Sequence, residues 1–281
     1  MRYIADHDFH IHSTISPCCH DENQTPENIL KYAKENGLKQ ICLTNHLWDE
    51  KVKSPSVWHE KQRFGCLAEA LPLPQDENVE FLFGAEADMD YEYTVGVSEE
   101  RYDIFDFIVI PTTHLHLEGY TVKEKIQTPE EAAEHWVKRL HELLKKDMPW
   151  HKMGIAPLTC NHILKGRAPE VIKLLDDKDL YNLFQKCSEK GVGIELNIKT
   201  LSLSQEEKDI LLRPYYIAKD CGCKFYLGSD SHKLEALKTA KENFEDIITL
   251  LDLKESDKFI IGKKTLKQPQ NTTKNTEKKT E

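Results

Sequence analysis

The strongest constraint on the fold of this 281-residue chain is the alternation of seven short apolar runs with longer stretches of helical periodicity. Parallel strands need long crossover connections, so strands that alternate with helices predict βα units and a parallel sheet. The expected strands are residues 3–12, 40–46, 80–88, 105–114, 154–162, 192–198 and 224–232.

Helix start signals lie between these runs. Thr25 and Thr128 each precede a proline and an acidic residue, which is typical of an N-cap followed by a first helical turn. Ser204 with Glu207 three residues later forms a capping-box sequence. Seven strands with intervening helices favour a closed barrel in a single domain. An open doubly wound sheet is the alternative, because periodicity does not give the strand order.

Two segments depart from the alternation. Residues 47–78 are longer than a usual βα connection, and we expect a helix near 58–71 that forms part of a lid or wall. Residues 263–281 have no apolar period and are expected to be a disordered basic tail after a domain at 1–262. Six lysines and two glutamates give this tail a net charge of +4. Because the whole chain has a net charge of −10, residues 1–262 have a net charge of −14.

Charge and cysteine content narrow the possible partners. An acidic body is a poor match for the phosphate backbone of nucleic acid, but its carboxylates suit divalent cations. No apolar run approaches the ~20 residues that span a bilayer, and the amino terminus has no signal-peptide stretch, so we expect a cytoplasmic protein. Eight cysteines without a Cys-x-x-Cys motif are expected to be reduced, apolar side chains; a redox or thiolate–metal role is the less favoured alternative. The oligomeric state stays open.

The polar chemistry is concentrated where the expected strands end. His10 with His12, and Asp230 with His232, are two residues apart and therefore share a face of a strand. The carboxyl ends of all strands in a βα barrel meet at one mouth, where active sites are built. The side chains expected there are His10, His12, His46, Glu86, His114, His162, Asp230 and His232.

A single histidine at a strand end is more often a hydrogen-bonded structural residue than a ligand. Six strand ends that carry histidine, aspartate or glutamate instead favour a metal cluster. Imidazole with bridging carboxylate suits zinc, iron or manganese better than magnesium or calcium. The remaining histidines are assigned to surfaces or helices; they are His7, His59, His135, His141 and His151.

These elements resemble the PHP (polymerase and histidinol phosphatase) superfamily in content and order, over residues 1 to about 262. The opening His-x-His and the closing Gly-Ser-Asp-x-His are its specific motifs. The full set is Asp8-Phe9-His10-Ile11-His12, His20, Thr44-Asn45-His46, Gly84-Ala85-Glu86, His114, His162, Glu195-Leu196-Asn197 and Gly228-Ser229-Asp230-Ser231-His232. The resemblance implies a distorted (β/α)7 barrel, in agreement with the seven strands.

The resemblance also implies a site for two to three divalent transition-metal ions. His10, His12, Glu86 and Asp230 would bind the first ion. Glu86 would bridge to a second ion held by His114 and His162, and His20, His46 and His232 would hold a third. His116 is a rival of His114, which we favour because it closes an apolar run.

Members of this length resemble histidinol phosphatases, so the implied activity is hydrolysis of a small phosphomonoester, histidinol phosphate being the first expectation. Water activated by the metals would attack phosphorus without a protein nucleophile, and Glu86 would hold the ions close together. Asp230 or a neighbouring histidine would protonate the leaving oxygen. Cations that follow barrel strands are candidates to meet the phosphate: Arg167 and Lys199 first, with Lys165 and Lys233.

Several positions depart from the family pattern, which affects the substrate more than the metals. Asn45 stands where aspartate is usual, and residues 112–116 and 160–162 lack the glycines typical of histidinol phosphatases. The alternatives are therefore a PHP enzyme for another ester (a nucleotide, a sugar phosphate or phosphotyrosine) or a non-catalytic PHP module. An amidohydrolase, which also begins with His-x-His, is less favoured because Glu86 and not lysine is the bridging candidate.

Overall fold

The computed structural model describes residues 1–261, apart from the side chains of 58–60. All seven expected strands are present and pair in parallel, in the order β1-β2-β4-β5-β6-β7-β8. The strands are shorter than predicted, because residues at one or both ends of the predicted runs lie outside the ladder. Their bounds are β1 His7–Ile11, β2 Gln40–Leu43, β3 His46–Leu47, β4 Glu80–Ala87, β5 Phe107–Pro111, β6 Met153–Ala156, β7 Gly193–Leu196 and β8 Lys224–Leu227. The expected strand 40–46 divides into β2 and a short β3, which pairs with β4.

The sheet nearly closes on itself between β1 and β8. At the carboxyl end of this seam, the Asp230 amide donates to the His10 carbonyl at 2.8 Å and the His12 amide to the Ser231 carbonyl at 3.0 Å. At the other end, the Leu227 amide donates to Nε2 of His7 at 3.1 Å, so a side chain replaces a ladder hydrogen bond. The assignment of His7 to a surface or helix was therefore wrong, since it is buried in the seam. The closure confirms the distorted barrel in place of an open sheet.

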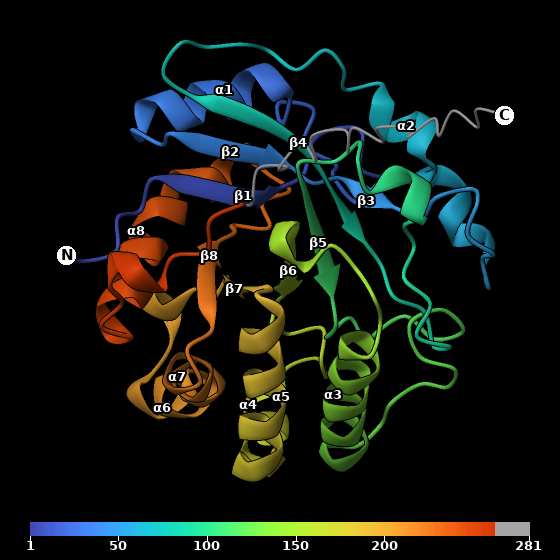
Figure 1. Ribbon diagram of the computed structural model, residues 1–281, viewed down its shortest axis with the longest axis vertical. Helices are drawn as coiled ribbons and strands as arrows, with labels where there is room; N and C mark the ends of the chain where they lie inside the picture. The colour runs from blue at the N-terminus through green and yellow to red at the C-terminus, as the bar shows by residue number, and fades with distance from the viewer. Residues whose placement is uncertain (262–281) are drawn as a thin grey trace, which may run out of the picture.

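Helices surround the sheet on its outer side (Figure 1). The α-helices are α1 Pro26–Glu35, α2 Phe64–Ala68, α3 Pro129–Leu144, α4 Ala168–Leu174, α5 Asp177–Lys190, α6 Gln205–Leu211, α7 Arg213–Asp220 and α8 Leu234–Leu250. Short 3-10 turns are η1 Val57–Gln62, η2 Glu99–Arg101, η3 Trp150–Lys152, η4 Thr200–Ser202 and η5 Glu255–Asp257. Thr25, Thr128 and Ser204 are N-caps as predicted, the last two within capping boxes. Within residues 1–261, no helix has the length and apolar character needed to cross a bilayer.

The barrel interior is filled by aromatic side chains rather than left open. Phe9, Phe107 and Tyr226 pack together there, with ring centroids of Phe107 and Tyr226 5.0 Å apart. Phe259 joins them from the segment after α8, and its amide donates to the Phe225 carbonyl at 2.7 Å. These rings fill the barrel interior at this end, and the strand-end ligands lie at the opposite mouth. The basic tail at 263–281 lies outside the described residues.

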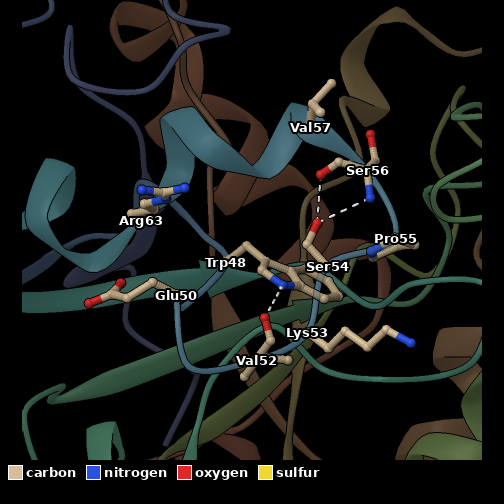
Figure 2. A pocket seen from close by; sticks show the side chains of 9 residues that line it. All are labelled: Trp48, Glu50, Val52, Lys53, Ser54, Pro55, Ser56, Val57 and Arg63. Carbon is tan, nitrogen blue, oxygen red and sulfur yellow. Dashed lines mark hydrogen bonds between the residues drawn. The ribbon is translucent and has the colours of Figure 1, made fainter.

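The long connection after β3 carries η1 and α2, so the helix expected near 58–71 is present in two pieces. Residues 48–63 surround a pocket of about 410 Å³ (Figure 2). The buried Trp48 indole points into it and donates from Nε1 to the Val52 carbonyl at 3.1 Å. None of the strand-end histidines or carboxylates lines this pocket among the described residues.

Candidate metal centre

Four of the predicted ligands converge at the mouth of the barrel. His10 and His12 come from the end of β1, Glu86 from β4 and Asp230 from the turn after β8. One ligand atom from each lies within 4.8 Å of the others. Nε2 of His12 is 3.3 Å from Oε2 of Glu86 and 3.2 Å from Oδ1 of Asp230. Asp230 has a backbone φ of 49°, a left-handed conformation that aspartate tolerates better than most residues.

Hydrogen bonds behind the two histidines decide which ring nitrogens face this group. Nδ1 of His10 lies 2.6 Å from Oε2 of Glu195, and Nδ1 of His12 lies 3.0 Å from Oγ of Ser16. Ser16 donates its own proton to Oδ1 of Asn45 at 3.0 Å, so it can accept from His12. Both Nδ1 atoms are thus engaged, and the two Nε2 atoms face each other at 3.1 Å. Two such nitrogens need a proton or a cation between them.

Glu86 supplies the second indication of a cation. Its carboxylate is 1% exposed, and neither oxygen accepts a hydrogen bond of good geometry from any described residue. Burial opposes its ionisation, but His46 and His10 hold the pKa of Glu86 well below its usual range. A buried anion is costly unless positive charge compensates it, and protonated imidazoles or a metal ion held among them can supply that charge. The donor set therefore fits a divalent transition metal.

Glu195 lies directly behind this group of ligands, and no role was assigned to it from the sequence, although its motif was noted. Besides contacting His10, its carboxylate accepts hydrogen bonds from the Tyr226 hydroxyl at 3.1 Å and the Asn197 amide at 2.7 Å. Burial raises the pKa of Glu195. Burial alone would lower the pKa of His10, but Glu195, Asp230 and Glu86 hold it well above its ordinary value. A carboxylate behind a ligating histidine fixes the tautomer and raises ligand basicity.

Asp88 is a second residue at the site that the sequence analysis did not include among the predicted ligands. Oδ1 of Asp88 lies 3.4 Å from Nδ1 of His114, and Oδ2 lies 3.7 Å from Nδ1 of His46. It is two residues after Glu86 and therefore on the same face at the end of β4. The rule that paired His10 with His12 would have found it.

The structure brings His114 close to Glu86, with Nε2 3.9 Å from Oε1. His162 is exposed, and its ring centroid is 5.5 Å from that of His114. His116 is also exposed and stacks on His162 at 4.2 Å. The geometry thus places His114, and not its rival His116, beside the bridging candidate.

A second group of ligand atoms contains His12, His46, His232 and a residue that was not predicted, Cys18. Sγ of Cys18 is 3.0 Å from Nε2 of His232. His46 links the two groups, because its Nδ1 is 3.0 Å from Oε2 of Glu86. His20, which the family resemblance implied as a ligand, lies exposed at the surface and belongs to neither group.

A cavity of about 420 Å³ opens beside the first group, between the segments that follow β6 and β7. Its polar lining is Thr159, Asn161, His162, Asn197, Lys199, Ser202, Glu207 and Asp230. Lys199 is the only one of the four candidate cations that lines it in the described structure. Arg167 instead forms a two-pronged ion pair with Glu170 on its own helix, at 2.7 and 3.0 Å. Lys165 and Lys233 are exposed outside the cavity.

Comparison with known proteins supports this reading of the fold. The model of the PHP domain family matches residues 8–199. A histidinol phosphate phosphatase of Lactococcus lactis, solved with zinc, L-histidinol and phosphate, has a similar structure: TM-score 0.56, 15% identity, 89% of this chain and 94% of that chain covered. A candidate histidinol phosphatase of Listeria monocytogenes has a TM-score of 0.54 at 14% identity, with 82% and 96% covered. At such identities the likeness concerns the fold. No curated protein matches the chain.

Proposed function

The chain belongs to the PHP domain family, and from this premise we propose that it is a metal-dependent phosphoesterase acting on a small phosphomonoester. The observation that carries the proposal is the buried carboxylate of Glu86 among the imidazoles of His10, His12 and His46. It belongs to a group of ligand atoms whose Asp230 lines a cavity of small-molecule size. A non-catalytic module would have no need to keep these histidines and carboxylates together at the barrel mouth, beside an open cavity.

The residues that would hold the metals are those that converge at the mouth of the barrel. His10, His12, Glu86 and Asp230 form one site, and Glu86 with His114 and His162 contributes to a second. When bound, divalent cations neutralise charge on phosphoryl oxygens and lower the pKa of water. The number of ions expected is two to three, of zinc, manganese or iron, as the ligand types favour.

The protein's own groups orient and recognise the substrate. Glu195 and Ser16 hold the imidazoles of His10 and His12 with their Nε2 atoms inward. Oδ1 of Asp230 lies 3.5 Å from Nε2 of His10 and 3.2 Å from Nε2 of His12, so Asp230 would be an anionic metal ligand. Lys199, which lines the cavity, would bind the phosphate. We do not assign Arg167 to catalysis, since Glu170 engages its guanidinium.

Histidinol phosphate is the substrate that we propose. The Lactococcus lactis structure, which shares the fold, holds L-histidinol and phosphate. In this chain the cavity carries a second carboxylate, Glu207, whose pKa is lowered by the Ser204 amide. A negative charge in the cavity favours a leaving group that carries a cation, as the ammonium of an amino alcohol does.

A panel of phosphomonoesters and phosphodiesters, assayed with protein loaded with zinc or manganese, tests the proposal. We expect phosphomonoesters to be hydrolysed, with the highest kcat/KM for histidinol phosphate. A different ester that is preferred by more than about tenfold would overturn the substrate; it would leave the reaction class in place. No hydrolysis of any ester by metal-loaded protein would overturn the reaction class.

Glu207→Gln tests whether the negative charge of Glu207 favours a substrate with a cationic leaving group. Glutamine retains the capping box with Ser204 but removes the charge. KM for histidinol phosphate should rise about 2- to 5-fold, while KM for an ester with a neutral leaving group stays unchanged. The matched control is Glu206→Gln on the same helix turn, which does not line the cavity.

A further inference from the structure

The second group of ligand atoms differs from a purely histidine and carboxylate site, because it contains a thiol. Cys18 lies with Sγ 3.0 Å from Nε2 of His232, and ligand atoms of Cys18, His46 and His232 lie within 4.8 Å of one another. His12 also belongs to the group, but its Nε2 faces Glu86 and Asp230 and its Nδ1 contacts Ser16. His12 therefore serves the first site, and Cys18, His46 and His232 remain for another ion.

The segment that carries Cys18 is fixed in place from several directions. The neighbouring Cys19 donates from Sγ to the His232 carbonyl at 3.2 Å. Oδ2 of Asp21 accepts from the Leu234 amide at 2.9 Å, which ties the segment to the start of α8. The buried Gln24 amide donates to the carbonyls of His12 and Ser231. These contacts hold Cys18 toward the histidines and leave His20, two residues later, exposed.

We propose that Cys18, and not His20, is the third protein ligand of a metal ion held by His46 and His232. On binding, the thiol releases its proton to solvent, and the thiolate supplies a negatively charged soft donor. Three protein ligands are the number found in catalytic zinc sites, so an ion held here would remain accessible to water or substrate. A thiolate ligand favours zinc over manganese and magnesium at this position. The inference rests on the proposed function only in that metals bind at the barrel mouth.

Cobalt(II) is the probe that reports this ligand directly, because thiolate bound to cobalt gives a charge-transfer absorption in the near ultraviolet and imidazole or carboxylate does not. Metal-free full-length protein is titrated with cobalt, and bound cobalt is measured on the same samples. We expect the band in the wild type and its loss in Cys18→Ser. Zinc affinity of this site should fall at least about 10²-fold in that variant, beyond the loss seen when groups behind a ligand are changed.

Two neighbours serve as matched controls. Cys19→Ser keeps a hydrogen-bond donor to the His232 carbonyl, and His20→Ala removes only the exposed imidazole. Both should retain the band and the bound cobalt. Loss of the band in Cys19→Ser would show that the wrong cysteine was chosen. Loss of a metal ion in His20→Ala would assign that position to His20 and overturn the proposal.

Zinc-edge X-ray absorption on the unmodified protein covers the case in which Cys18→Ser fails to fold. A sulfur neighbour near the ~2.3 Å typical of zinc–thiolate bonds supports the proposal, and a shell of nitrogen and oxygen alone contradicts it. The outcome is separate from that of the activity assay. A thiolate signal without ester hydrolysis would overturn the proposed function only, whereas hydrolysis with metals bound and no thiolate signal would overturn the role of Cys18 only.

Discussion

His10 and His12 can both direct Nε2 into the centre because each has a partner for Nδ1. For His10 the partner is the buried Glu195 carboxylate, at 2.6 Å. Glu195 in turn accepts from the Tyr226 hydroxyl inside the barrel. Hydrogen bonds from Tyr226 to Glu195 and between Glu195 and His10 therefore connect the packed interior to the proposed metal site.

Glu195→Gln should weaken metal binding more than it weakens folding. Glutamine keeps the volume and can still accept from His10, but it no longer raises the basicity of the imidazole. We expect metal affinity to fall about 10- to 100-fold, with kcat recovered at high metal concentration. Isothermal titration with zinc, together with kcat measured against free metal, checks this. Tyr226→Phe removes one hydrogen bond to Glu195 but keeps its charge, so metal affinity should fall by less than in Glu195→Gln. A kcat that excess metal does not restore would contradict the positioning role.

Glu86→Gln should affect two metal sites together. The amide keeps the shape but removes the charge that holds two cations close, so turnover of a phosphate ester should fall at least ~10³-fold, several kcal/mol of transition-state stabilisation. Folding should largely persist, since the strands do not depend on this side chain. Metal content and turnover are measured on one preparation. Full metal content with activity within about tenfold of the parent would show that Glu86 has only a structural role.

Among the elements, α3 helps to fix the loops that follow β4 and β5, through its Arg139. Its Arg139 is 1% exposed and reaches under the segments after β4 and β5. The guanidinium donates to four main-chain carbonyls at 2.6–3.2 Å, those of Met89, Asp90, Thr112 and Thr121. These carbonyls lie in the chain near Asp88 and His114, so one side chain sets the position of both loops.

Arg139→Met should destabilise the fold, because it leaves several buried carbonyls without a donor. We expect a loss of at least about 3 kcal/mol in the free energy of unfolding and a fall in Tm of about 6 °C or more. Thermal unfolding of metal-free protein checks this, with Lys138→Met as the exposed neighbour that should change stability by less than about 0.5 kcal/mol. Equal effects of the two substitutions would contradict the role given to Arg139.

For the molecule as a whole, the packing of the barrel interior fixes the hydrogen bonds that connect Tyr226 through Glu195 to His10. Gly154 on β6 lies directly against the Tyr226 ring, and a methyl group there would overlap it. Gly154→Ala should therefore cost about 1–3 kcal/mol and displace the Tyr226 hydroxyl from Glu195, so zinc affinity should fall as well. Gly65→Ala, with no neighbour within 4 Å of the added carbon, should be neutral in both measurements. An unchanged zinc affinity in Gly154→Ala would show that interior and site are independent.

The sequence predicts the barrel and much of its mouth for one physical reason. Strand periodicity and the meeting of parallel strand ends depend only on local spacing, so His10, His12, Glu86 and Asp230 could be placed together before the structure. Asp88 obeys the same rule and could have been included.

Contacts made by irregular segments could not be predicted in this way. Cys18 lies in a loop whose path depends on distant partners such as Leu234 and Asn45, and periodicity carries no information about it. Arg167 follows a strand in the sequence, but a glutamate three residues later on the same helix competes for its guanidinium. His7 fills a gap in the ladder that only the closed barrel creates.

The central claim, that metal ions in this centre perform phosphoester hydrolysis, is tested most directly by metal content and turnover on the same protein. Protein purified without chelator should hold about two to three transition-metal ions per chain and hydrolyse phosphomonoesters. Removal of the ions by a chelator should abolish turnover, and zinc or manganese should restore it in proportion to the metal bound. A metal content near zero in active protein, or turnover that survives complete removal of metal, would contradict the account.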